Sequence, residues 1–325
     1  MTRRGLAFLG CGFATRLHSR TLKRFPRVER YYASRDAERA REYATRYSGA
    51  GALASYEAAI DHTDVDVVLI GTPPNTHLPL ARAALAAGKH VIVEKPPFLR
   101  SADFDQVEEL VEATGRRLFV AENYFYKPLL REIRSVLKAG TIGDVKVITI
   151  NALKQQKTGD WRDRTEDAGP GALFEGGIHW VSFLANLGLE VADAHGYRAG
   201  KREGPDRTMV AVFEYAGGAV GTLCYSWEIG SPLKGLRLSA VYGSEGAITF
   251  ESNGLFLAVR GRRRRLTTPH PRDLLGYSAM FEDFFRALDS GGSPEYDLSL
   301  ARRDLELVER IYATAGKSRH PSVDS

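Results

Sequence analysis

The chain has 325 residues, of which 43% are hydrophobic and 26% charged, and its formal net charge at pH 7 is +5. This composition indicates a globular protein of one large domain or two domains, and no apolar run approaches the ~20 residues that a membrane helix needs. The N-terminus lacks the long apolar region of a secretory signal. The two cysteines, Cys11 and Cys224, have no metal-ligand spacing. We therefore expect neither a disulfide framework nor a metal site, and a cytoplasmic location.

Most of the visible excess of positive charge lies in one short segment, at Arg260 and in the run 262–265. Such a run is usually a solvated hairpin or the end of a strand, so we expect no nucleic-acid or membrane partner. An anionic substrate or a partner subunit is the better-supported use of this charge.

The first apolar run, Gly5–Leu9, ends in a glycine-rich turn that is followed by a helical stretch, 16–25. A buried strand, a glycine turn and a helix form the first unit of a dinucleotide-binding fold, in which the helix N-terminus faces the pyrophosphate. Thr15 stands where a third glycine would favour close packing of helix on strand. The alternative is an ordinary strand-to-helix turn. The predicted phosphate-binding residues are Gly10, Gly12, Phe13 and Ala14.

Strands and helices alternate over the first 120 residues or so. This alternation predicts βαβ units, and hence a doubly wound parallel sheet with right-handed crossovers, in a dinucleotide-binding domain of residues 1–122. The expected strands are 28–34, 65–70, 90–93 and 118–121, and the expected helices are 36–47, 77–87 and 102–114.

After Glu122 the pattern changes to longer strand candidates that are separated by glycine-containing turns. It predicts a second α/β domain, residues 123–325, with a large, mostly antiparallel open sheet and a long insertion at 154–187. Asp297 is the expected N-cap of a closing helix. The expected strands are 145–153, 208–215, 219–227, 236–242 and 247–251, and the expected helices are 128–139 and 297–315.

The end of the second strand selects the cofactor. An Asp or Glu about 20 residues past the glycines usually binds the ribose hydroxyls of NAD, and here Ser34 and Arg35 take its place. Serine and arginine bind a 2′-phosphate, whereas a carboxylate repels one. The pattern favours NADP(H), although NAD(H) stays possible because Asp36 follows closely and Arg35 is also explained as a solvated side chain.

Two proline-stiffened loops follow the next two strands of the predicted parallel sheet. The first runs from Thr72 to His77 and the second contains Glu94, Lys95 and two prolines. Loops at the carboxyl ends of parallel strands border the ligand crevice. Plain turn chemistry and a solvated lysine are the alternative. The residues predicted to contact the dinucleotide here are Thr72, Pro73, Asn75, His77, Glu94, Lys95 and, after the next strand, Asn123.

These loops carry a resemblance that covers nearly the whole chain. The glycine turn, Thr72-Pro73-Pro74-Asn75 with His77, and Glu94-Lys95-Pro96 occur in order, followed by 140–143 (Gly-Thr-Ile-Gly) and the glycine-rich segment 169–179, which ends in His179. Together they resemble the glucose–fructose oxidoreductase / inositol dehydrogenase / rhizopine catabolism family. The resemblance implies a sugar or polyol oxidoreductase in which Lys95 lies beside the nicotinamide.

The resemblance also implies that His179 carries the proton, with Glu175 at the acid position four residues before it. Most such enzymes have Asp there, and many have a second acid where this chain has Ser182. From the residues alone, histidine has a suitable pKa for proton exchange near neutrality, and an acid at i−4 of a helix shares its face. A histidine satisfied within the core is the alternative.

Two aromatic groups are candidates for the substrate pocket, although aromatic core and exposed arginines explain them equally well. The residues are Tyr124, Tyr126, Trp161 and Arg162. The sequence thus predicts a NAD(P)-dependent dehydrogenase or reductase that forms a homodimer or homotetramer. Its predicted substrate is a CH–OH group of a sugar, inositol or related polyol, with phosphorylated and nucleotide-linked forms included. The alternatives are a redox-assisted glycosidase with tightly bound dinucleotide and a non-catalytic dinucleotide sensor.

Overall fold

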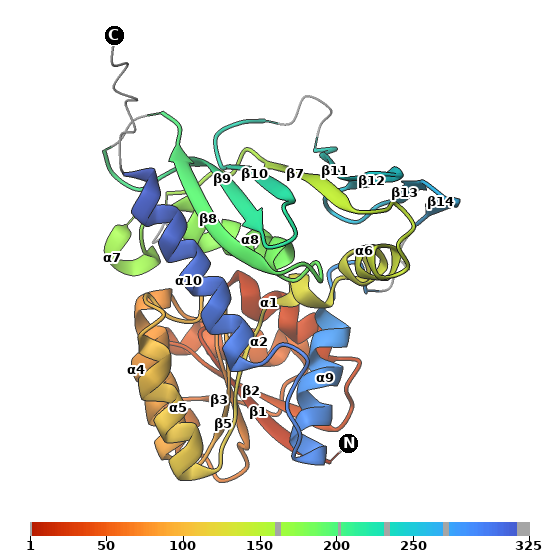
Figure 1. Cartoon of the computed structure of the whole chain (residues 1–325). Helices are drawn as coiled ribbons and strands as arrows, with labels where there is room; N and C mark the ends of the chain where they lie inside the picture. The colour runs from red at the N-terminus through yellow and green to blue at the C-terminus, as the bar shows by residue number, and fades with distance from the viewer. Residues whose placement is uncertain (1, 160–163, 201–202, 231–234, 269–272, 317–325) are drawn as a thin grey trace. The chain divides into compact units, whose positions relative to one another are not determined.

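The computed structural model describes residues 2–159, 164–200, 203–230, 235–268 and 273–316 (Figure 1). The chain divides into two compact units. Unit 1 contains the residues up to Tyr126 together with Glu166–Gly169 and Gly276–Arg303, and unit 2 contains Lys127–Thr165, Pro170–Leu275 and the described residues from Asp304 onward. No helix in the described part of the chain is both long and apolar enough to cross a membrane.

Unit 1 is built on a six-stranded parallel sheet in the order β3-β2-β1-β4-β5-β6. The order reverses between β1 and β4, which is the switch point of a doubly wound dinucleotide-binding sheet. All four residues of β4 are buried, as a strand covered on both faces requires. The strands are β1 (Arg4–Leu9), β2 (Val28–Ala33), β3 (Gly51–Leu53), β4 (Val67–Ile70), β5 (His90–Val93) and β6 (Leu118–Val120). The predicted fold class of the first domain is confirmed.

The helices of unit 1 differ from the prediction in three places, the first being α1, which spans Phe13–Leu22 where 16–25 was expected. A short helix before β4 and a long helix far along the chain, α9, have no counterpart among the expected elements. Phe281 of α9 packs against Phe25 and His18 of the segment around α1, with ring centroids 6.1 and 5.4 Å apart. The helices are α1 (Phe13–Leu22), α2 (Ala37–Tyr47), α3 (Tyr56–Ile60), α4 (His77–Ala86), α5 (Asp103–Thr114) and α9 (Tyr277–Ser290).

Unit 2 is built on an eight-stranded sheet in the order β14-β13-β12-β11-β7-β10-β9-β8, in which only β7 and β10 run parallel. This confirms the predicted mostly antiparallel sheet, while β3 of unit 1 and β8, β13 and β14 were not predicted as strands. The strands are β7 (Val145–Leu153), β8 (Val191–Arg198), β9 (Thr208–Tyr215), β10 (Val220–Ser226), β11 (Leu238–Gly243), β12 (Gly246–Glu251), β13 (Leu257–Arg260) and β14 (Arg264–Thr267).

One face of the unit 2 sheet is buried beneath helices. Phe250 of β12 packs against Phe183 of α8 (Ile178–Ala185), and the Tyr215 hydroxyl of β9 donates to the Leu184 carbonyl at 3.2 Å. Gly196 of β8 lies so close to α10 (Leu298–Ala315) that an added Cβ would be 2.3 Å from the Ile311 carbonyl oxygen. The remaining helices are α6 (Pro128–Lys138) and α7 (Thr165–Ala168).

The predicted cap of the closing helix is present. The Leu300 N–H donates to the Asp297 carboxylate at 3.0 Å, and the helix, α10, begins one residue later at Leu298. The arginine segment forms the β13–β14 hairpin. Arg262 pairs with Glu245, and Arg265 lies 2.9 Å from Glu132 of α6.

Candidate functional site

The turn between β1 and α1 has two glycines with different requirements. Gly10 has φ +98°, and a Cβ there would lie 2.9 Å from the Gly71 carbonyl oxygen. At Gly12 the nearest atom to an added Cβ, apart from its two chain neighbours, is the Gly71 carbonyl oxygen at 4.0 Å, so the space before the first N–H groups of α1 is open. Glycine is therefore required at position 10 by the conformation and close packing of the backbone, whereas Gly12 leaves room for a bound group.

Two side chains hold this turn from within. The Thr15 hydroxyl donates to the Gly10 carbonyl at 2.6 Å, so the residue at the third glycine position supports the turn. The Tyr43 hydroxyl of α2 donates to the Gly12 carbonyl at 3.1 Å. Phe13 is 60% exposed with the Arg16 guanidinium 4.9 Å from its ring centre, and Ala14 is half-buried. Sequence reasoning missed Tyr43, whose spacing from Tyr47 on one helix face indicates only core packing.

The end of β2 presents one exposed cation, which is followed by an acid that caps the next helix. Ser34 is buried and its hydroxyl accepts the Asp36 N–H at 3.2 Å, whereas Arg35 is exposed. The Asp36 carboxylate caps α2 by accepting the N–H groups of Glu38 and Arg39 at 3.0 and 3.3 Å. The cap uses only Oδ1, so the choice between a 2′-phosphate and ribose hydroxyls depends on Arg35 and Asp36 together.

The loops after β4 and β5 are joined through one imidazole. His77 is 1% exposed, with Nε2 2.8 Å from the Thr72 carbonyl and Nδ1 3.0 Å from the Pro96 carbonyl. Burial lowers the pKa of His77, against the opposing effect of these carbonyls. The ring fixes the Thr72 loop, where Pro73 is extended, to the loop that carries Lys95. Asn75 donates to the Asp167 carboxylate at 3.0 Å.

Lys95 follows β5 at the same edge of the sheet as the glycine turn. It is half-buried, and its N–H donates to the Glu94 carboxylate at 3.1 Å. Glu94 is in turn bound by the buried His18 of α1. Sequence reasoning also missed His18, which has the spacing of an ordinary core residue.

After β6, the predicted residues separate into one half-buried and two buried side chains. Tyr124 is half-buried, and its N–H donates to the Glu122 carboxylate at 2.9 Å. Asn123 is buried. Tyr126 is fully buried and its hydroxyl donates to Asp283 at 2.7 Å, and burial raises its pKa. We therefore drop Tyr126 as a substrate-binding residue. Trp161 and Arg162 lie outside the described residues.

In unit 2, the glycine-rich segment before His179 is shaped by one buried acid. Gly171 has φ +152°, and a Cβ there would lie 2.1 Å from Asp206 Oδ1. The Asp206 carboxylate accepts the Leu173 N–H at 3.1 Å and the Tyr312 hydroxyl, and burial raises its pKa. Asp206 thus acts as a remote N-cap, and no local sequence signal indicates this.

His179 is the second residue of α8, which directly follows a π-helical turn. Glu175 is 8% exposed within the turn Leu173–Gly177, and His179 is half-buried at the start of α8. In a π-turn the hydrogen bonds span five residues, so residues four apart do not stack as they do in an α-helix. The pairing of Glu175 with His179 therefore stays a prediction. Such turns frequently occur at functional sites.

Ser182, which stands where many relatives have a second acid, lies in the packed interior of unit 2. It is fully buried, and Asn186 donates to its carbonyl at 2.8 Å and to Asp304 at 3.2 Å. Within the described residues, no group of three or more His, Cys, Asp or Glu side chains has a metal-binding arrangement.

A doubly wound sheet with an open glycine turn at its switch point defines a dinucleotide-binding protein. Residues 4–122 match the model of the oxidoreductase family with an NAD-binding Rossmann fold, and residues 130–249 match the GFO/IDH/MocA C-terminal domain. The chain belongs to this oxidoreductase family, as the sequence resemblance predicted.

Three similar proteins illustrate the family. Trans-1,2-dihydrobenzene-1,2-diol dehydrogenase of Bos taurus is 32% identical over 63% of this chain and 62% of its own length. dTDP-3,4-didehydro-2,6-dideoxy-alpha-D-glucose 3-reductase of Streptomyces violaceoruber is 35% identical over 45% of this chain and 43% of its own. Less than two thirds of either relative is therefore covered. A levoglucosan dehydrogenase in complex with NADH and levoglucosan has the same fold, with a TM-score of 0.85 at 24% identity over 96% of this chain and 97% of its own.

Proposed function

We propose that this protein is an NAD(P)-dependent dehydrogenase or reductase, with NADP(H) favoured, that acts on a CH–OH group of a sugar, inositol or related polyol. The observation that carries the proposal is the position of Lys95, which follows β5 at the carboxyl edge of the sheet that also presents the open glycine turn. The names of the diol and sugar relatives support the substrate class. We assign dinucleotide binding to residues 1–122 and substrate binding to residues 123–325.

The residues at this edge fit a dinucleotide. The open space at Gly12 and the N–H groups that begin α1 suit a pyrophosphate, and exposed Arg35 suits a 2′-phosphate. When bound, the nicotinamide supplies or accepts the hydride.

We assign the remaining chemistry to side chains of the chain. The Lys95 ammonium polarises the substrate oxygen, and the His179 imidazole accepts the hydroxyl proton in oxidation and returns it in reduction. Glu175 orients His179, and half-buried Tyr124 contributes to the polyol pocket. The acid–base role suits histidine because its charge changes near neutral pH.

Hydride transfer is the direct test. The protein is incubated with NADP⁺ or NAD⁺ and myo-inositol, glucose, glucose 6-phosphate, levoglucosan or a cyclic trans-diol, and reduced nicotinamide is followed by absorbance. We expect reduction with at least one of these probes. If deuterium at the reacting carbon never reaches the nicotinamide, the proposal is wrong. Glycoside cleavage without net NADPH formation would identify the redox-assisted glycosidase instead.

Replacing Arg35 by alanine tests the cofactor preference. A charge-assisted phosphate contact contributes about 1.5–3 kcal/mol, so the variant is expected to bind NADPH about tenfold more weakly or worse while NADH affinity stays nearly unchanged. Fluorescence titration measures both dissociation constants. Arg39→Ala, on the first turn of α2, is the matched control. Equal losses for the two cofactors would contradict the NADP preference.

We further propose that the protein forms a homodimer through the open face of the unit 2 sheet. Strand register places one row of residues across this face, from the acids of β8 and β9 through apolar residues to two arginines. The row is Asp193, Glu214, Val220, Val147, Tyr242, Ala247, Arg260 and Arg264. His195 lies between the two carboxylates, at 3.4 and 3.5 Å.

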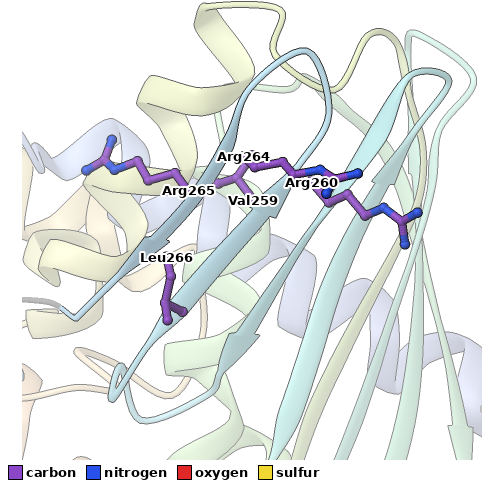
Figure 2. Close-up of a pocket in the computed structure, with 5 residues that line it drawn as sticks. All are labelled: Val259, Arg260, Arg264, Arg265 and Leu266. Carbon is purple, nitrogen blue, oxygen red and sulfur yellow. The ribbon is translucent and has the colours of Figure 1, made fainter.

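The row is self-complementary under a two-fold rotation. Figure 2 shows the Arg260 and Arg264 side chains extending in one direction and Arg265 in the opposite one. An axis parallel to the strands brings the acidic end of one copy over the arginines of the other. Val220, Val147 and Tyr242, each 41–47% exposed, would be covered.

Charge reversal tests this interface by light scattering. The native protein is expected near twice 35.9 kDa at micromolar concentration. Arg260→Glu with Arg264→Glu is expected to weaken dimerisation about 10²-fold, because like charges then face each other. Adding Asp193→Arg and Glu214→Arg restores complementarity and the dimer. The proposed interface is wrong if the native protein is a monomer, or if the charge reversals leave the dimer dissociation constant unchanged.

A further inference from the structure

His18 is a buried histidine on α1 whose ring has one hydrogen-bonding partner in the described structure. It is 0% exposed, and its Nε2 is hydrogen-bonded to the Glu94 carboxylate. Nδ1 has no hydrogen-bond partner among the described residues. Because an ionised carboxylate only accepts hydrogen bonds, Nε2 carries a proton and donates it to Glu94.

Two aromatic rings of α9 enclose this imidazole. The Tyr277 and Phe281 ring centroids lie 5.3 and 5.4 Å from that of His18, both with edge-to-face geometry. Burial first, and then the charge of Glu94, raises the pKa of Tyr277, so its hydroxyl keeps its proton. A hydrogen bond to a carboxylate is strong in such a buried, low-dielectric environment, and a polar group left there without a partner costs free energy.

The Glu94 carboxylate connects His18 to Lys95. One of its oxygens, Oε1, accepts the His18 proton, and the other, Oε2, accepts the Lys95 N–H at 3.1 Å. Glu94 is itself only 9% exposed. The Glu94 carboxylate thus links α1, the helix that starts at the glycine turn, to the backbone of half-buried Lys95 in the loop after β5.

We propose that His18 is a positioning residue for Lys95. By fixing the Glu94 rotamer, His18 holds the Lys95 backbone and so limits where the ammonium group can go. The effect on catalysis rests on the proposed role of Lys95, but the positioning itself does not. His18 touches no reacting atom in this scheme.

Competitive acetylation measures the positioning without any substrate. Trace labelled acetic anhydride is applied to the full chain over a range of pH, and peptide mass spectrometry gives the reactivity of each lysine. His18→Leu removes the donor, so Lys95 reactivity is expected to move at least about threefold toward that of Lys146, whose side chain is 60% exposed. His18→Gln keeps an N–H donor and is expected to stay close to the native protein.

Ser19→Ala is the matched control on the same helix. Ser19 is also 0% exposed, and its hydroxyl accepts that of Tyr32 at 3.0 Å, away from Glu94. This variant is expected to lose stability while Lys95 reactivity is unchanged. If it alters Lys95 as much as His18→Leu does, the effect is general packing and the proposal is wrong.

Glu94→Gln provides a second route should His18→Leu fail to fold. It weakens the same link, so Lys95 reactivity should change in the same direction, and in a double variant the two changes should not add. Native Lys95 reactivity in folded His18→Leu or Glu94→Gln overturns the proposal. An altered reactivity in a protein that transfers no hydride to any probe would refute the proposed function and leave the positioning intact.

With an active probe substrate, His18→Leu is also expected to lower kcat about tenfold while the NADPH dissociation constant stays within about twofold. A purely structural defect would lower the active fraction and leave the kcat of the folded fraction unchanged. His18→Gln should recover most of the lost kcat.

Discussion

Alanine in place of Lys95 or His179 is expected to lower kcat about 10²–10⁴-fold, the usual contribution of a general acid–base group. Cofactor affinity should stay within a few fold, since neither side chain is assigned to the pyrophosphate. Glu175→Gln should cost less, because it keeps the shape of the side chain and removes only its charge. Steady-state kinetics on the probe that is turned over fastest, with a fluorescence titration of NADPH, measures both quantities.

The chain offers a matched control for each residue. Lys89 lies in unit 1 with its ammonium bonded to the carbonyls of His62 and Val65 at 2.9 and 2.8 Å, and His195 lies on β8 of unit 2. Alanine at either position is expected to leave kcat within a few fold. Near-normal turnover in His179→Ala would make His179 a core residue and move the proton-carrying role to Tyr124.

Alanine at Gly10 and at Gly12 is expected to give opposite results. Gly10→Ala forces a side chain into a positive-φ conformation and toward the Gly71 carbonyl, so it should lower the free energy of unfolding by about 1–3 kcal/mol. Gly12 has φ −106°, which other residues also adopt, and an added Cβ there meets open space. Gly12→Ala should therefore keep a nearly native free energy of unfolding. Its methyl group occupies the approach of the pyrophosphate, and NADPH affinity should fall about tenfold or more.

Denaturant unfolding and NADPH titration on both variants separate these effects. The two substitutions add the same atom two residues apart, so each is the control for the other. Native NADPH affinity in Gly12→Ala would show that no phosphate approaches this turn.

The sequence predicts elements best where a strong apolar run is bounded by glycine or proline. The bounds of β5, β7 and β9 agree with the prediction at both ends. β8 was missed because its run contains Asp193, His195 and Gly196, and only the close approach of α10 explains that glycine. α9 was missed as well, although its buried residues have helical spacing, and nothing local shows that it packs in the first unit.

The individual segments of the candidate site were predictable from the sequence, but the contacts between distant residues were less so. The glycine turn and Lys95 stand out because strand ends are visible in the sequence. The π-turn at Glu175 and the remote cap by Asp206 depend on contacts between distant residues, 35 positions apart for Gly171 and Asp206. His18 and Glu94 are separated by 76 residues, and no spacing rule connects them.

The return of α9 to the first unit has a consequence for biosynthesis. Phe25, His18 and their neighbours are covered by residues 277–290, which are synthesised long after α1. The aromatic surface of the nascent dinucleotide unit therefore stays uncovered until α9 has been synthesised. Chain arrest before Tyr277 should leave that surface open to chaperones, and cofactor capture should follow synthesis of α9.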